Sequence, residues 1–258
     1  MINRILFLII TIVIFIILFN YNYKNIYVLS KKELIAHLLN YDDNYFDRFN
    51  NTDLKVRNVN NIKEYKINIV QAVCNPSNDI ILKLKKCAIH ADNILEKMNS
   101  KYDSNIHGVD INKLKDIKWK FGIICNDLYE NGLPHTRGDV IVINSQQIYN
   151  TSIQSLSNTL IHEKVHIYQK MYKSETKSYI KNNFKVIKTV EKADNIRANP
   201  DTDNFIYVDF KDRIYKAEYL PDSVHIKDVR LYNNNQEFEH PLESAAVLFS
   251  NKASSFSI

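Results

Sequence analysis

The chain has 258 residues, of which 45% are hydrophobic and 24% charged, and a formal net charge of +5 at pH 7. This length and balance suit one substantial domain, or one domain with a small additional part, and argue against a disordered chain. The chain has four glycines, a low count that argues against a glycine-rich phosphate-binding loop, and neither GxGxxG nor GxxxxGK occurs. No dense basic run accompanies the positive charge, so we expect no nucleic-acid partner.

The amino-terminal segment predicts a membrane anchor. Ile5–Phe19 is a strongly apolar run without any charged residue and is preceded by Arg4, and Tyr21 and Tyr23 can serve as interfacial residues that extend the span. Because no small-residue cleavage site follows, the pattern favours an uncleaved anchor over a signal peptide. We therefore expect a single-pass membrane protein anchored by a transmembrane helix within residues 1–25, in an orientation that the flanking charges do not decide.

The next part of the chain, residues 26–117, predicts a mainly helical region. A capping-box pattern at 30–33 opens a helix that runs to about Asn40. Glu64–Val73 has the character of a strand, and Ser77 can cap a longer helix with an apolar stripe on one face. These elements would pack beside the remainder of the chain.

Residues 118–258 predict a mixture of strands and helices, and hence an α+β fold. The assignments rest on alternation of apolar residues for strands and on helical spacing for helices. In chain order they are strands over Trp119–Cys125 and Val140–Ile143, helices over Thr159–Gln169 and Lys177–Asp194, a hairpin of Phe205–Phe210 with Ile214–Leu220, and a helix beginning at Pro241.

Three cysteines, Cys74, Cys87 and Cys125, have neither CxxC spacing nor the spacing of a Cys/His finger. They therefore predict no structural zinc site of their own and no obvious disulfide framework. One disulfide with one free thiol is compatible with this count.

The segment Thr159–Gln169, which reads TLIHEKVHIYQ, carries the clearest chemical signal. On a helix, His162 and His166 lie on one face, so both imidazoles can reach a single metal ion. Glu163 lies one residue further round, where a carboxylate can take a proton from a water that the metal activates. A capping-box pattern at 151–154 supports the helix. The alternative interpretation is two ordinary histidines on an amphipathic helix.

This order of strands, HExxH helix and downstream acid resembles the zincin metallopeptidases, and among them the gluzincins. The resemblance extends from about Lys118 to the C-terminus and implies a zincin-like domain with a mixed sheet. It also implies that the strand before the helix, here Gly138–Asn144, is a sheet edge that pairs with an extended peptide. The Asn-, Ile-, Lys- and Tyr-rich composition, with the segments PHTRGDVIVIN, RANPD and EHPLE, further resembles uncharacterised relatives from large DNA viruses.

The resemblance implies a third zinc ligand, a glutamate from a later helix. The metzincin extension is excluded because Ile-Tyr-Gln-Lys follows His166. Glu243, in the sequence HPLESAA, is the first choice for the third ligand. Glu191 is the alternative, because its separation from His166 is nearer that of the best-known gluzincins.

These roles predict a mechanism in which Zn²⁺, held by His162, His166 and Glu243, lowers the pKa of a water and Glu163 accepts its proton. The oxyanion that forms on the substrate needs a further hydrogen-bond donor. Four side chains are candidates for this contact to the transition state or substrate: His135, His225, His240 and Tyr207.

The sequence therefore predicts a membrane-anchored, zinc-dependent metallopeptidase that acts on a peptide or protein substrate. The alternative is a non-catalytic membrane or virion structural protein that retains a zinc-binding or peptide-binding domain. Retention of Glu163 favours the enzyme, because this residue is not itself a metal ligand.

Overall fold

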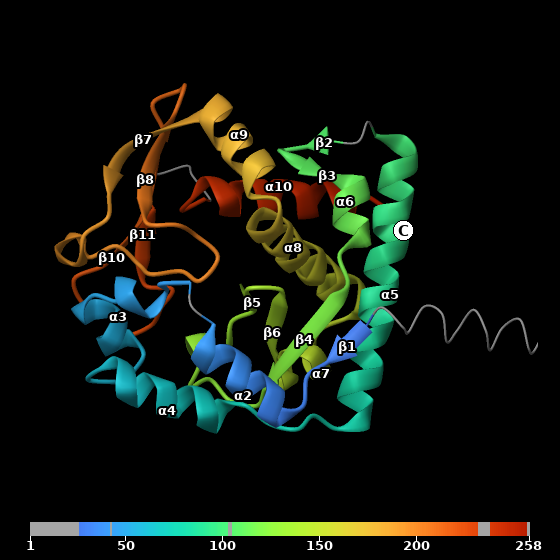
Figure 1. Cartoon of the computed structure of the whole chain (residues 1–258), viewed down its shortest axis with the longest axis horizontal. Coiled ribbons are helices and arrows are strands. Elements are labelled where there is room, and N and C mark those ends of the chain that lie inside the picture. The colour runs from blue at the N-terminus through green and yellow to red at the C-terminus, as the bar shows by residue number, and fades with distance from the viewer. Residues whose placement is uncertain (1–25, 42, 103–104, 232–237, 257–258) are drawn as a thin grey trace, which may run out of the picture.

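The computed structural model describes residues 26–41, 43–102, 105–231 and 238–256 (Figure 1). The α-helices are α2 (Lys31–Asn40), α3 (Asn51–Val56), α4 (Ile62–Ala72), α5 (Asn78–Lys101), α6 (Ile111–Asp116), α7 (Ser145–Asn150), α8 (Ile153–Met171), α9 (Lys173–Asn183) and α10 (Pro241–Ser254). Short 3-10 turns are η1 (Phe46–Arg48), η2 (Glu130–Gly132) and η3 (Lys192–Asp194).

The strands are β1 (Ile26–Val28), β2 (Asn105–Ile106), β3 (Val109–Asp110), β4 (Trp119–Ile124), β5 (His135–Arg137), β6 (Val140–Asn144), β7 (Phe184–Thr189), β8 (Phe205–Asp209), β9 (Ile214–Tyr215), β10 (Ala217–Tyr219) and β11 (Val229–Leu231). The main sheet has the order β1-β4-β6-β5. Its first three strands are parallel, and β5 is antiparallel to β6. The expected α+β class with a mixed sheet is therefore correct.

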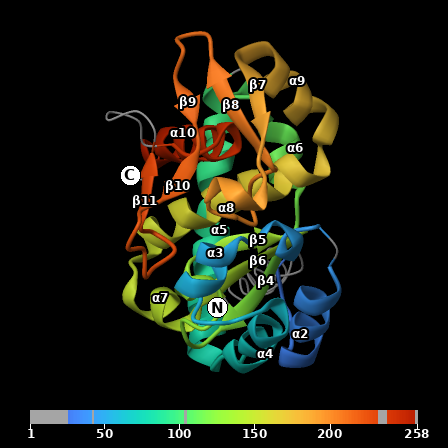
Figure 2. The ribbon, with the colours of Figure 1, turned by 90° about the vertical axis from the view of Figure 1, so that its left-hand side faces the viewer.

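Helices cover both faces of this sheet (Figures 1 and 2). Side chains alternate across a strand, so Phe121 and Ile123 join the core formed with α5 and α8. Val140 and Val142 point the other way, into the core formed with α2 and α4. Gly122 lets α2 approach closely, because a Cβ there would lie 2.4 Å from Leu34.

Helix α8 lies at the centre of the molecule and packs against α5, α10 and the main sheet (Figure 1). Its amino-terminal cap is Ser152, whose hydroxyl accepts a hydrogen bond from the backbone N–H of Ser155 at 3.2 Å. The helix thus begins one residue later than the capping pattern at 151–154 predicted. Its buried positions continue round most of the circumference, as expected for a helix enclosed by other elements.

Predictions for the amino-terminal part are mixed. The capping box of Ser30 and Glu33 and the helix to Asn40 are confirmed, as is the long helix capped by Ser77. The strand predicted over Glu64–Val73 is wrong, because these residues lie mostly in α4. Asn61 caps α4, and its buried residues recur at helical spacing, whereas the apolar alternation in this stretch imitates a strand.

Two predictions in the second half also need correction. The helix expected over Lys177–Asp194 ends at Asn183, and Phe184–Thr189 forms β7, because these residues pair with β8. The expected hairpin is confirmed only where β8 pairs with β9. Beyond Tyr215 the chain forms β10, which pairs with β11 instead of β8.

The prediction that Gly138–Asn144 forms an edge of the sheet is wrong. Gly138–Asn144 contains β6, which pairs with β4 on one side and β5 on the other, so it lies inside the sheet. The edge next to β6 is β5, which is joined to β6 by the short turn at Gly138 and Asp139, and β1 forms the opposite edge. Gly138 has a φ of +62°, a conformation that glycine adopts without a steric penalty.

The prediction of a transmembrane anchor is also corrected. Within the four described ranges, no helix combines the length and the apolar character that a membrane span requires. Helix α5 has 24 residues, but charged side chains recur along it, including Lys83, Lys85 and Lys86. The expected anchor falls on residues 1–25, outside the described part. The described part of the chain therefore gives no support to the expected single-pass membrane localisation.

A buried ionic cluster joins distant segments beneath the main sheet. The Arg57 guanidinium pairs with Glu130 at 2.9 Å and with Asp53 at 3.0 Å, and these side chains are almost fully buried. The hydroxyl of Tyr45 donates to Glu130 at 2.6 Å. Burial alone would raise the pKa of Glu130, but the Arg57 charge, together with His135 and the hydrogen bonds from Arg57 and Tyr45, lowers it. This cluster fixes the turn that leads into β5.

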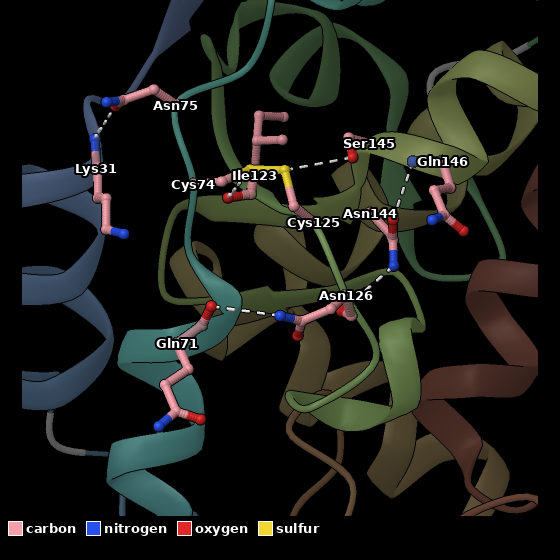
Figure 3. Close-up of a disulfide and its surroundings, with 10 residues drawn as sticks. All are labelled: Lys31, Gln71, Cys74, Asn75, Ile123, Cys125, Asn126, Asn144, Ser145 and Gln146. Atoms are coloured by element: carbon pink, nitrogen blue, oxygen red, sulfur yellow. Dashed lines mark hydrogen bonds between the residues drawn. A yellow bond between two sulfur atoms is a disulfide. The ribbon is translucent and has the colours of Figure 1, made fainter.

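A disulfide joins Cys74, which follows α4, to Cys125 at the end of β4 (Figure 3). Backbone hydrogen bonds support the same junction: Cys74 N–H donates to Ile123, and Cys125 N–H donates to Ala72. Cys87 is free and buried. The crosslink ties the helices on one face of the sheet to its central strand.

We predict that replacing Cys74 and Cys125 by Ala lowers the free energy of unfolding by about 4 kcal/mol, because the bridge closes a loop of about 51 residues in the unfolded chain. Urea denaturation with and without a thiol reductant measures this. The reductant should destabilise the wild type and leave the double variant unchanged. A wild type that is insensitive to reduction would contradict the prediction.

Candidate metal centre

Three side chains from two helices converge at the candidate centre. His162 and His166 lie one turn apart on α8, and their Nε2 atoms are 3.0 Å apart. Helix α10 begins at Pro241, with the ring of His240 accepting from the backbone N–H of Leu242. This start places Glu243 in the first turn, facing the two imidazoles.

The distances among the three groups fit a metal-binding site. Oε2 of Glu243 is 3.4 Å from Nε2 of His162 and 3.5 Å from Nε2 of His166. Tetrahedral zinc with metal–ligand bonds near 2.0–2.1 Å requires ligand atoms about 3.3 Å apart. Two neutral imidazoles and a carboxylate are also ligand types that zinc prefers. Among the described residues, these three form the group of His, Cys, Asp and Glu side chains that could hold a metal ion.

Supporting hydrogen bonds orient the three groups. Nδ1 of His166 is 2.9 Å from Oε1 of Gln169, an arrangement in which Nδ1–H donates and Nε2 keeps its lone pair for a metal. Gln169 Nε2 in turn donates to the backbone carbonyl of Leu242 at 3.0 Å, which links α8 to α10. Asn199 Nδ2 donates to Oε1 of Glu243 at 2.9 Å and leaves Oε2 directed at the histidines.

The carboxylates of Glu243 and Glu163 have opposite electrostatic environments. Burial would raise the pKa of Glu243, but the adjacent His166 and His162 outweigh it and hold that pKa well below its usual value. Burial and the nearby Asp201 charge raise the pKa of Glu163 to about 8, against the lowering effect of His162. The Oε2 atom of Glu163 is buried without a hydrogen-bond partner. A carboxyl group in this state can both take up and release a proton near neutral pH.

Beside these groups is a cavity of about 340 Å³, with His162, Glu163 and Glu243 in its wall. This volume is at the lower end of the range for ligand pockets, about 300–1,000 Å³. Much of the remaining lining is apolar: Leu133, Pro134, Ala198, Pro200, Ile226, Val229, Leu231, Phe238 and Val247.

Of the predicted substrate contacts, only His135 lines this cavity. Its Nδ1 is 2.9 Å from the carbonyl of Leu133, and its Nε2 is buried without a partner. Burial lowers the pKa of His135, so the neutral ring carries its proton on Nδ1 and presents Nε2 as an acceptor. It can donate a hydrogen bond from Nε2 only when protonated.

The other three candidates lie elsewhere. His240 Nε2 is 2.9 Å from Asp203, and the hydroxyl of Tyr207 donates to the same carboxylate at 2.7 Å. These contacts stabilise the start of α10, and neither His240 nor Tyr207 lines the cavity. His225 is exposed and lies outside the cavity wall.

Glu191, the alternative third ligand, is exposed at the start of η3 and lines a different cavity of about 750 Å³. The structure thus brings Glu243, and not Glu191, to the two histidines. That His162, His166 and Glu243 act as metal ligands remains a prediction.

Sequence reasoning missed Gln169, Asn199 and Asp201. Gln169 lies three residues after His166, so helical spacing alone could have indicated a partner for the imidazole. Asn199 and Asp201 belong to a loop far from the motif, and no spacing rule connects them to it.

Comparison with known proteins adds no relative: no family model, curated protein or solved structure matches this chain. Function is therefore inferred from the motif, the convergence of the three side chains and the cavity beside them.

We predict about one zinc ion per chain in the full-length protein after metal-replete purification, with the zinc lost from the His162→Ala and Glu243→Ala variants. Metal analysis after gel filtration measures this. Glu191→Ala is the matched control and should keep its zinc, because its carboxylate lies outside the group. Zinc loss from Glu191→Ala but not from Glu243→Ala would reverse the assignment.

We further predict that Gln169→Leu weakens zinc binding by about 10–100-fold, because it removes the partner that orients His166. Competition with a fluorescent chelator measures the affinity. Gln154→Leu replaces an exposed glutamine on the same helix and should bind zinc as the wild type does. Equal affinity of all three proteins would show that Gln169 does not orient the ligand.

Proposed function

We propose that this protein is a zinc-dependent metallopeptidase that hydrolyses peptide bonds with an activated water. The observation that carries the proposal is the convergence of His162, His166 and Glu243 within 3.0–3.5 Å, with Glu163 beside them in the wall of one cavity. The resemblance of the HExxH motif to gluzincins points to the same chemistry.

The three ligands would hold zinc from one side and leave the cavity side for water and substrate. When bound, zinc would supply Lewis acidity, lowering the pKa of water towards about 7 and polarising a substrate carbonyl. The hydrogen bonds that His166 donates to Gln169 and that Asn199 donates to Glu243 hold the ligands in this orientation before substrate arrives.

Glu163 is the proposed general base. It follows His162 on α8 and lines the cavity, yet it is not one of the three converging groups. Its buried, unpartnered carboxylate oxygen is free to accept the proton of the attacking water and then to deliver it to the leaving amine. A positive ion near this side chain would lower its pKa and keep it ionised before the reaction.

His135 is the proposed substrate contact. With its Nδ1–H directed to Leu133, the neutral ring offers Nε2 as an acceptor to a donor on the substrate. Stabilisation of an oxyanion by His135 would require the protonated ring, which burial disfavours.

We predict that Glu163→Gln retains its zinc and loses about 10²–10⁴-fold in kcat, because the amide cannot accept the proton. Turnover is measured by mass spectrometry on a randomised peptide library, beside metal analysis of the same samples. Glu191→Gln, an exposed acid away from the cavity, should match the wild type.

Undiminished cleavage by Glu163→Gln would remove this residue from the role of base. A zinc-loaded wild type that cleaves no peptide in the library would favour the non-catalytic alternative, in which the domain binds zinc or a peptide without turnover.

A further inference from the structure

The outer edge of the main sheet, β5, is already occupied within the molecule. In a three-residue strand paired on one side, alternate residues direct their backbone groups outward. The residue that does so here is Thr136: its N–H donates to the carboxylate of Asp201, at 3.2 and 3.1 Å from the two oxygens. Its carbonyl accepts from Nζ of Lys170 at 2.8 Å.

Thr136, Asp201 and Lys170 each contact the other two. Nζ of Lys170 is 2.7 Å from Asp201, and the Thr136 side chain also bonds with both charged groups. Asp201 is 5% exposed and Thr136 fully buried. Burial would raise the pKa of Asp201, but Lys170 and His166 outweigh it and lower the pKa to about 2. The ionised carboxylate therefore stays on the strand edge at neutral pH.

The loop that carries Asp201 is held in place from several sides. Asn199 accepts from the backbone N–H of Asp201 at 2.8 Å and donates to Glu243. The Arg48 guanidinium donates to the carbonyl of Asn199 at 2.8 Å. Pro200 and Asp201 are buried and line two cavities. One is the cavity of about 340 Å³ beside His162, Glu163 and Glu243, called the metal-side cavity below, and the other is the cavity of about 750 Å³. The segment Ala198–Asp201 is therefore a fixed partition between the two cavities.

An extended peptide that binds by strand addition needs unpaired N–H and C=O groups along the sheet edge. At β5 those groups are satisfied by side chains of the protein itself. An incoming strand would have to displace a buried carboxylate and break charge-assisted hydrogen bonds, which are stronger than the neutral bonds it could form.

We propose that Asp201 and Lys170 are specificity-determining residues that close β5 to strand addition and confine the site to short peptides held in the metal-side cavity. The apolar lining of that cavity would bind their side chains, in place of sequence-independent backbone pairing along the sheet. This inference rests on the proposed peptidase function.

The first test compares cleavage of end-blocked, randomised tetrapeptide and dodecapeptide libraries by the zinc-loaded full chain. The wild type should cleave tetrapeptides with a higher kcat/KM. Asp201→Ala and Lys170→Met should each raise the ratio of kcat/KM for dodecapeptides to kcat/KM for tetrapeptides by about tenfold, the worth of one or two added hydrogen bonds. The ratio is compared within each protein because the Asp201 charge also raises the pKa of Glu163, so its removal affects the cleavage of both libraries. Lys173→Met, which removes an exposed ammonium from the second cavity, should leave the ratio unchanged.

The second test does not require turnover. Amide hydrogen exchange of the full chain, read on fragments that cover residues 133–138, should show Thr136 protected in the wild type with or without the dodecapeptides. In Asp201→Ala and in Lys170→Met, which alters a less buried side chain, the Thr136 amide should exchange faster than in the wild type. Its exchange should slow again when dodecapeptides are added. Wild-type protection that increases with dodecapeptides, or a wild-type preference for the longer library, would overturn the proposal. Absence of all cleavage with the expected exchange pattern would count against the peptidase function alone.

Discussion

The structure depends on the contact between α8 and α10, because this contact brings the three candidate ligands together. Helix α10 presents small buried residues, among them Ala245, Ala246 and Ala253, which allow close packing against its neighbours. The hydrogen bond from Gln169 to Leu242 fixes how the first turn of α10 meets the helix that carries both histidines. A small shift of either helix would separate the ligand atoms, since metal–ligand distances tolerate only about 0.2 Å.

The centre also contains charge that folding alone does not favour. Glu163 is buried with an unpartnered oxygen, an arrangement that costs about 1–3 kcal/mol in a protein interior. Asp201 and Glu243 add negative charge nearby, and this charge raises the pKa of Glu163 further. The disulfide lies away from this centre and stabilises the scaffold that holds it. The Arg57 cluster reaches the centre, because its member Glu130 lines the same cavity as Glu163. Such a buried, perturbed acid in the wall of a cavity is typical of functional sites.

The loop Ala198–Asp201 connects three features that would otherwise be independent. Through Asn199 it contacts the candidate ligand Glu243, and through Asp201 it occupies the edge of the main sheet. It also separates the cavity beside Glu163 from its larger neighbour. Orientation of the ligand and access along the sheet are thus coupled in a single segment of backbone.

The sequence by itself determined the local features of this protein. Helical spacing predicted that His162 and His166 share a face, and a proline at the first position of α10 predicted the helix that carries Glu243. It failed where long-range pairing decides the outcome: Phe184–Thr189 becomes a strand only because β8 lies beside it, and β6 lies inside the sheet because the chain folds back as β5. The sequence ranked Glu243 ahead of Glu191, but only the tertiary structure decided which of them lies beside the histidines and what Asn199 and Asp201 contact. Spacing rules act within one element, whereas these contacts join elements that are far apart in the sequence.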